Sequence, residues 1–329
     1  MWFKNAQLFQ FIGTCELNAE QLEQDLIFHG FKPCLSTAHS SMGWTAPTGE
    51  EDTPLVHAAN GFLLICLKLE DKILPASVIN EMLADKIAAI EAQTGRKPGK
   101  RERANMREDL VHSLLPRAFS KSTYLYAYID TQQGWLVLNS PSANKADVFI
   151  DYLRKSIGSL KIQLPEIQPV SLLLTDWVMT NEYPADFSID DTCVLTDNAD
   201  GGTIRCQRQD LMSQEIKGLL ETGREIAQLT LTWRDQVRFT LTNELVIKSI
   251  KFLEIIQDQA KDIFTETAQQ QFDATFTLMT ETLRQLVEQL ISIFGKSAEN
   301  THPTIETEAP APEAEAAQPE TPAPSETNV

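Results

Sequence analysis

The sequence predicts an α+β protein in which strands and helices are mixed along the chain. Short runs that alternate apolar and polar residues, typical of strands, occur in both halves of the 329 residues. Other segments carry apolar residues at steps of three and four, which is typical of amphipathic helices. Single cores rarely grow past about 250–300 residues, so the length allows two or three compact units.

The first 75 residues are expected to combine strands with one short helix. Gln7 to Cys15 and Gly61 to Leu69 are predicted strands, the second of them buried. Asn18 is expected to cap a helix, because Gln21 follows it at the spacing of a capping box. Residues 40–54 contain two glycines and two prolines, and we expect a loop there.

Two helices joined by a basic loop are predicted after residue 75. Apolar residues recur at helical steps in the first helix, at Ile79, Met82, Leu83, Ile87 and Ile90. The glycine- and proline-containing segment Thr94–Lys100 breaks this pattern, and a second helix is expected from Arg103 to Leu115. Such a helical hairpin would form a projecting tip.

A strand hairpin and a helix are expected next. The three tyrosines of residues 122–129 alternate with apolar residues, and a turn at Thr131–Gly134 leads into a strand at 135–138. Ala143 to Ile157 is a predicted helix that ends at Gly158. Because a strand, a helix and paired strands then occur twice in the first 160 residues, the pattern suggests a weak internal duplication.

The second half is predicted to be rich in strands. A helix is expected at Leu211–Thr222, and a long buried helix at Phe272–Ile293, where apolar steps of four and three alternate. The predicted strands are Leu172–Trp177, Thr203–Gln207, Ile226–Trp233, Val237–Thr242 and Leu245–Phe252.

From these elements we expect four regions. Residues 1–75 and 117–168 would form a central α+β domain, and residues 76–116 the helical tip with its basic loop. Residues 169–296 would form a strand-rich base domain with C-terminal helices. Residues 297–329, rich in Ala, Pro, Glu and Thr, are expected to be a disordered acidic tail.

The net charge of −18 is unfavourable for a nucleic-acid partner, but the charge is unevenly distributed. Residues 297–329 hold seven glutamates and no Lys or Arg, whereas residues 96–121 hold eight Lys or Arg against three Asp or Glu. A basic segment on an acidic protein can still attract phosphate, because salt screens charges beyond about 8 Å. Charge alone leaves DNA binding open.

Five widely spaced cysteines without a Cys-x-x-Cys pair indicate reduced thiols. Neither a secretory signal nor an apolar run of about 20 residues is found, so we expect a cytoplasmic protein with no membrane contact.

Motifs for catalysis or cofactor binding are missing from the sequence. It contains no phosphate-binding loop, dinucleotide fingerprint, nucleophile elbow or paired-histidine metal motif. The densest acidic clusters, Glu50–Asp52 and Asp190–Asp191, could hold Mg²⁺ for a nuclease, but in a loop-like context solvated charge is the commoner explanation. We therefore expect a protein that is not an enzyme and needs no cofactor.

Nine short strings resemble the RdgC family of proteobacterial recombination-associated proteins, and they occur in order from residue 2 to the last helix. Only the acidic tail lacks a counterpart in the family pattern. The strings are Trp2-Phe3-Lys4-Asn5, Met42-Gly43-Trp44, His57-Ala58-Ala59-Asn60-Gly61, Lys72–Pro75, His112–Ser120, Leu153–Leu160, Leu174–Val178, Gln209–Leu211 and Phe272–Ala274.

The resemblance implies a nucleoid-associated protein that binds double-stranded DNA with little sequence preference and restrains the recombinase RecA. It also implies multi-lobed, horseshoe-like subunits that close into a ring-shaped homodimer. In such a ring only the inner wall need be positive, and contacts of Lys and Arg with phosphates give affinity without reading bases.

Three residues match positions at the family's subunit junctions. Phe119 corresponds to an aromatic residue at one junction, the gate. Arg208 and Gln209 match a Lys-Gln pair at the other, and the change from Lys to Arg keeps the charge but alters the donor geometry. From charge and resemblance together, the residues expected to contact DNA are Arg96, Lys97, Lys100, Arg101, Arg117, Lys121, Arg208 and Gln209.

Other interpretations stay open at this point. Phe119 could pack in a core, and the basic loop could simply be solvated. The protein could also be an adaptor that acts by contacting recombination or replication proteins, or a Mg²⁺-dependent nuclease.

Overall fold

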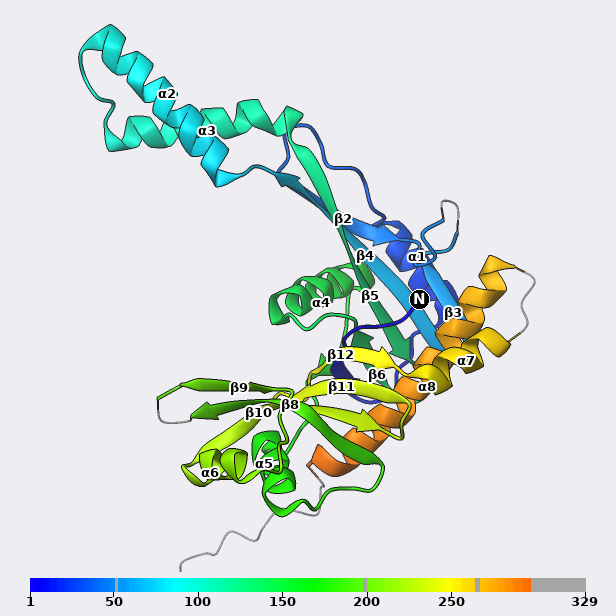
Figure 1. Ribbon diagram of the computed structural model, residues 1–329. Helices are drawn as coiled ribbons and strands as arrows, with labels where there is room; N and C mark the ends of the chain where they lie inside the picture. Colours follow the sequence, from blue (N-terminus) through cyan, green and yellow to red (C-terminus); the bar gives the residue numbers. More distant parts are fainter. Residues whose placement is uncertain (51–52, 198–199, 264–266, 297–329) are drawn as a thin grey trace, which may run out of the picture. The chain divides into compact units, whose positions relative to one another are not determined.

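Two antiparallel sheets organise residues 1–295 (Figure 1). The computed structural model describes residues 1–50, 53–197, 200–263 and 267–296, and its mixed helices and strands confirm the predicted α+β class. The tail expected at residues 297–329 lies outside the described residues. No helix in the described ranges is both long and apolar enough to cross a bilayer.

The first sheet has seven strands in the order β2-β4-β5-β6-β1-β7, with β3 also paired to β4. Its longest pair, β4 and β5, runs in register from Phe62↔Asp130 to Ile73↔Phe119. The strands are β1 (Gln7–Phe11), β2 (Ser40–Thr45), β3 (Val56–Ala59), β4 (Phe62–Ile73), β5 (Phe119–Asp130), β6 (Trp135–Leu138) and β7 (Ile162–Gln163).

Both faces of this sheet are buried at the end away from the hairpin, where β4 begins and β5 ends. Side chains alternate along a strand, so Leu63 and Ile65 of β4 join one core while Phe62 and Leu64 join the other. Helices α1 (Ala19–Ile27) and α4 (Ala143–Ile157) cover the first face. The long helix α8 (Ala268–Phe294) contributes Phe276 to the second core. As predicted, the Asn18 side chain caps α1 by accepting from the Gln21 N–H at 2.8 Å.

The second sheet has five strands in the order β12-β11-β10-β8-β9. Its apolar side chains, such as Leu231 and Phe239, share one core with Leu283 and Leu286 of α8. The elements are α5 (Val170–Thr180), β8 (Phe187–Asp197), β9 (Thr203–Gln207), α6 (Gln214–Glu221), β10 (Arg224–Trp233), β11 (Val237–Thr242), β12 (Ile247–Phe252) and α7 (Glu254–Asp262).

A helical hairpin extends beyond the ends of β4 and β5 (Figure 1). It consists of α2 (Ala76–Thr94) and α3 (Lys100–Leu114), as predicted, and a short 3-10 turn (Leu115–Arg117) connects it to β5. Only Ile79 and Leu110 are buried within the two helices, so polar contacts assist the pairing. One of these is the 2.7 Å bond from Arg107 Nη1 to Asn80 Oδ1.

Two element predictions were wrong. Residues 172–177 belong to α5, in which Val170, Leu174 and Trp177 are buried at helical spacing. Residues 40–45 form β2 instead of a loop. Gly43 is needed there because the Phe31 backbone packs directly against it and leaves no room for a Cβ. Four elements went unpredicted, namely β3, β7, β8 and α7.

The cysteines are unpaired thiols in the structure, as predicted. Cys66, Cys193 and Cys206 are buried, and Cys15 and Cys34 are half-buried. Burial raises the pKa of the Cys66 thiol to about 12, so that thiol stays protonated at neutral pH.

Acid is expected to weaken the contact between β3 and α8. The His57 ring packs edge-on against Phe272 and Phe276, with its Nε2 3.3 Å from Asp273 Oδ1. Burial lowers the pKa of His57, although Asp273 acts in the opposite direction. An unfolded histidine titrates near pH 6.5. The stability contributed by the neutral ring is therefore fully present above about pH 6.5. It is lost as the pH falls through the lower pKa that His57 has in the folded protein.

Urea unfolding at pH 7.5 and at pH 5 measures this effect. His57→Gln should lose less stability between the two pH values than the unaltered protein. Equal losses in the two proteins would contradict the assignment to His57.

Candidate nucleic-acid interface

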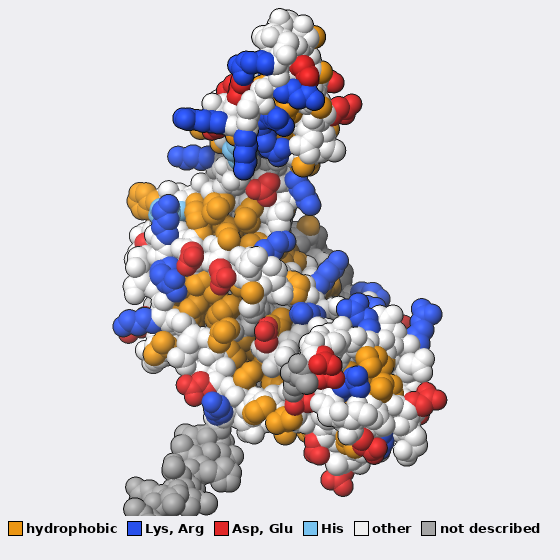
Figure 2. Space-filling view, turned by 90° about the vertical axis from the view of Figure 1, so that its left-hand side faces the viewer, with side chains coloured by type: hydrophobic (Ala, Val, Ile, Leu, Met, Phe, Trp, Pro, Cys, Tyr) orange, Lys and Arg blue, Asp and Glu red, His pale blue; other side chains and the backbone are white. Residues whose placement is uncertain are grey.

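Eight exposed Lys and Arg side chains lie on the helical hairpin and on the beginning of β5. We call this set the basic hairpin, and Figure 2 shows Lys and Arg side chains gathered over this part of the molecule. Its members are Arg96, Lys97, Lys100, Arg101, Arg103, Arg107, Arg117 and Lys121.

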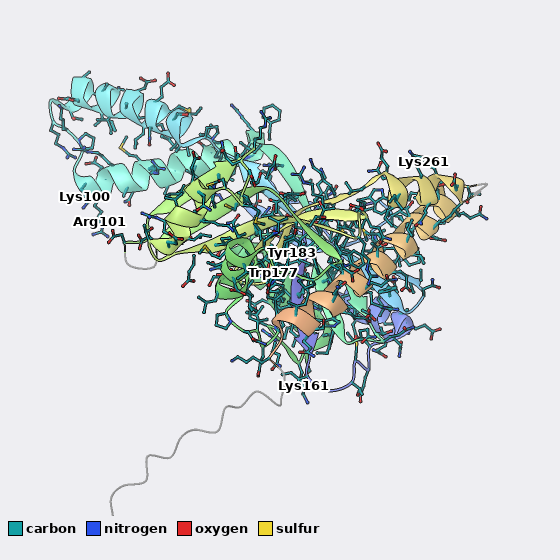
Figure 3. The ribbon with its side chains drawn as sticks, turned by 60° about the horizontal axis from the view of Figure 1, so that its bottom comes forward. Lys100, Arg101, Lys161, Trp177, Tyr183 and Lys261 are labelled. Atoms are coloured by element: carbon teal, nitrogen blue, oxygen red, sulfur yellow. The ribbon has the colours of Figure 1, made fainter. Side chains whose placement is uncertain are left out.

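The cations of the loop between α2 and α3 differ in their partners. Arg96 lies 3.2 Å from Glu102, and Lys97 lies 3.7 Å from Glu91. Exposed pairs of this kind contribute about 0–1 kcal/mol, so phosphate can replace the carboxylate at little cost. Within the described ranges, Lys100 and Arg101 pair with no carboxylate; they lie at the first turn of α3 (Figure 3).

Arg103 and Arg107 have a structural role that the sequence did not reveal. Arg103 Nε donates to the Pro98 carbonyl at 2.8 Å, and Arg107 reaches Asn80 on α2. These contacts hold the loop and the two helices together. The remaining members of the basic hairpin are therefore the better candidates for phosphate contacts.

Phe119 is exposed, and the interpretation that it packs in a core is wrong. Its exposed fraction is 83%, and it is the first residue of β5. Its register partner on β4 is Ile73, which is 46% exposed and which sequence reasoning did not single out. Arg117 and Lys121 flank Phe119 in the chain and are also exposed. An apolar pair thus lies beside cations at the base of the hairpin.

Arg208 and Gln209 lie elsewhere, between β9 and α6 of the second sheet. Both are exposed, and Arg208 has left-handed backbone geometry with a φ of 56°. The Gln209 N–H donates to the Asp191 carbonyl at 3.2 Å, which fixes the loop to β8. The structure therefore does not bring these two residues into the basic hairpin.

The acidic pair Asp190 and Asp191 lies on β8, so the expected loop context is wrong for this pair. Arg238 contacts both carboxylates, with Nε 2.6 Å from Asp190 Oδ2 and Nη2 3.2 Å from Asp191 Oδ1. A divalent cation here would have to displace the guanidinium that already pairs with both carboxylates. In the other cluster, residues 51 and 52 lie outside the described residues. Nowhere in the described ranges do three His, Cys, Asp or Glu side chains converge as metal ligands would.

Known proteins resemble this chain over nearly its whole described length. Residues 1–297 match a family model described as "RdgC: Putative exonuclease, RdgC". The recombination-associated protein RdgC of Tolumonas auensis is 39% identical over 297 residues, covering 90% of this chain and 98% of the relative. The protein of the same name from Aeromonas hydrophila shows the same identity and coverage. That from Yersinia pestis is 37% identical over 302 residues, covering 91% of this chain and 100% of the relative.

Proposed function

The chain belongs to the RdgC family, and on this basis we propose that it binds double-stranded DNA without sequence preference and acts in recombination as a nucleoid-associated protein of the cytoplasm. The observation that carries this proposal is the basic hairpin, in which the exposed cations Arg117 and Lys121 flank the exposed Phe119 in the chain. Lys and Arg that neutralise phosphates give affinity that is independent of sequence and falls with salt.

In the proposed assembly two horseshoe-like copies close into a ring around the duplex. Phe119 and Ile73 would form the gate junction, because exposed aromatic side chains are enriched at the cores of interfaces. Arg208 and Gln209 would act at the second junction. A ring of this kind would restrain RecA by occupying the duplex on which recombination proceeds.

A binding role is favoured over nuclease activity by Asp190 and Asp191. Both carboxylates already pair with the Arg238 guanidinium, which a metal ion would have to displace. We therefore include no catalytic step in the proposal. Loss of DNA substrate upon addition of Mg²⁺ would favour the activity named in the family description instead.

Charge reversal of the hairpin loop tests the DNA contacts. Changing Arg96, Lys97, Lys100 and Arg101 together to Glu should weaken duplex binding, because the loop would then repel phosphate. The slope of log affinity against log salt should fall by up to about 4 for each subunit that contacts the duplex, roughly one unit for each phosphate that is no longer neutralised. Fluorescence anisotropy across a salt series measures the slope.

A matched variant separates local contact from total charge. Changing Lys145, Arg154, Lys155 and Lys161 to Glu alters the net charge equally, and all four are exposed away from the hairpin. This variant should retain most of the slope. Equal reductions in the two variants would show that the hairpin loop has no special role.

A further inference from the structure

An apolar cavity of about 520 Å³ lies where the edge of the first sheet meets the turn between β11 and β12. Its size falls in the range of small-molecule sites, roughly 300–1,000 Å³. The connection after β7 and the first turn of α4 complete its walls. Most lining residues are apolar, among them Leu8, Phe9, Leu164 and Leu245, and the acidic residues Asp147 and Glu244 also line the space.

The cavity borders one backbone position at which β1 lacks a partner strand. Phe11 donates to Gly134 beside β6, so the odd-numbered residues of β1 face β6 and the even-numbered residues face away. On that outer side Ala6 exchanges two bonds with Ile247, and Gln10 pairs with Gln163. Leu8 lies between these two pairs. In the described chain no strand reaches its outward N–H and C=O.

The side chains show that the strand edge is what faces the cavity. The Leu8 side chain packs in one core and the Phe9 side chain in the other, on opposite faces of the sheet. Both residues nevertheless line the cavity. The backbone between them is therefore the part of β1 that borders this space.

A second polar group at the same cavity lacks a partner. Gln7 Oε1 is buried and has no hydrogen-bond partner among the described residues, and Gln7 lines the cavity. Buried polar atoms are normally paired, because leaving one unpaired costs its full desolvation penalty. The cavity thus combines apolar walls with a free backbone donor, a free backbone acceptor and a free side-chain acceptor.

We propose that this cavity binds a small, mostly apolar molecule carrying an amide edge, meaning an N–H and a C=O side by side as in a carboxamide or lactam. The edge would pair with the Leu8 C=O and N–H as a neighbouring strand does. An extended peptide does not fit this position, because the pairs at Ala6 and Gln10 close the edge on both sides of a single residue. Gln7 Oε1 accepts from the second N–H of a carboxamide.

The test uses benzamide as the probe and the full chain labelled with ¹⁵N. Benzamide should shift the amide resonance of Leu8, with saturable binding in the millimolar range or tighter. N,N-dimethylbenzamide lacks both N–H donors and should bind at least fivefold more weakly. Equal binding of the two probes, or shifts confined to residues outside the cavity, would overturn the proposal.

Two substitutions on α4 test whether the probe binds in the cavity. Ala143→Phe should fill the space and abolish the Leu8 shift, since Ala143 is an exposed lining residue. Val148→Phe changes an exposed residue of the same helix that does not line the cavity, and it should leave binding intact. Unchanged binding in Ala143→Phe would also overturn the proposal. DNA affinity is measured in the same samples, so failure here and failure of the DNA-binding proposal remain distinguishable.

Discussion

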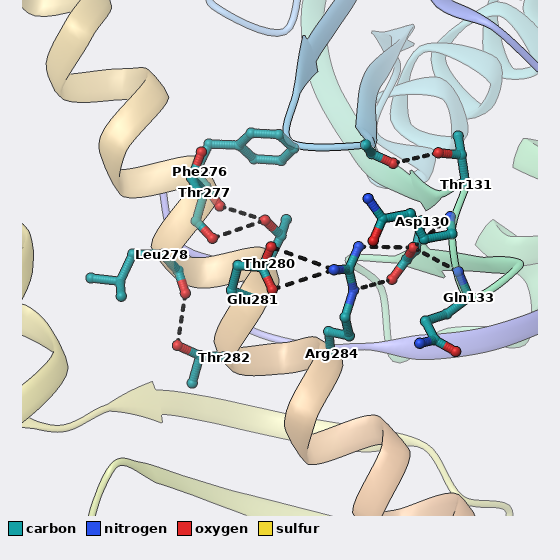
Figure 4. A network of polar contacts seen from close by, with 12 residues as sticks. Asp130, Thr131, Gln133, Phe276, Thr277, Leu278, Thr280, Glu281, Thr282 and Arg284 are labelled. Atoms are coloured by element: carbon teal, nitrogen blue, oxygen red, sulfur yellow. Dashed lines mark hydrogen bonds and ion pairs between the residues drawn. The ribbon is translucent and has the colours of Figure 1, made fainter.

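Replacing Arg284 by alanine is expected to lower the free energy of unfolding by about 3–5 kcal/mol, because it leaves a buried carboxylate without its opposite charge. Arg284 of α8 forms two bonds with Asp130 at the end of β5, with Nε 2.7 Å from Oδ2 and Nη2 3.0 Å from Oδ1 (Figure 4). Asp130 is 2% exposed. It also accepts from the backbone N–H groups of Gln132 and Gln133, which shape the turn into β6.

The guanidinium has a second contact, 4.1 Å from the ring centroid of Phe62 on β4. One side chain therefore connects α8 to two strands of the first sheet. Urea denaturation measures the decrease in stability, with Arg154→Ala as the control. Arg154 pairs with Asp151 at 3.1 Å on the surface of α4, where the expected decrease is under about 1 kcal/mol. Similar decreases in the two variants would contradict the importance of the buried pair.

Replacing Phe119 by alanine is expected to raise the dissociation constant of the proposed homodimer by about 30-fold or more, the size of an interface hot spot of at least roughly 2 kcal/mol. The effect on the stability of the subunit should stay within about 0.5 kcal/mol, because the side chain is exposed. DNA affinity should fall together with dimerisation, since the proposed ring would no longer enclose the duplex once its gate is open. Analytical ultracentrifugation and anisotropy measure the two effects.

Phe28→Ala is the matched control for this experiment. Phe28 is 84% exposed, close to the 83% of Phe119, but it follows α1 far from β5 in the sequence. It should leave both dimerisation and DNA binding unchanged. If Phe119→Ala behaves like Phe28→Ala, the gate role of Phe119 is wrong.

Local patterns predicted most of the fold. The capping of α1 by Asn18, the hairpin of α2 and α3, and the long stripe of α8 were all readable, because each depends on residues close in sequence. Residues 172–177 were assigned wrongly, since a short apolar run fits a strand as well as a buried helix. The glycines and prolines of residues 40–54 suggested a loop, but Gly43 allows close packing against Phe31, which periodicity does not record.

The candidate site was predictable in composition but not in geometry. The surplus of cations in residues 96–121 was visible, and all eight prove to be exposed. The sequence did not show which of these cations are structural and which are free to contact phosphate. Arg103 and Arg107 are structural because they bond to Pro98 and Asn80 across the hairpin. Ile73 was missed for a similar reason. Its place opposite Phe119 follows from the register of β4 with β5.

The most direct test of DNA binding is the affinity of the unaltered protein for two unrelated duplexes, measured by fluorescence anisotropy across a salt series. We predict tight binding that falls steeply with salt and hardly distinguishes the two sequences, as contacts to the phosphate backbone require. Absent binding, or binding that salt does not weaken, would contradict DNA as the principal ligand. It would favour instead an adaptor that acts by contacting recombination or replication proteins.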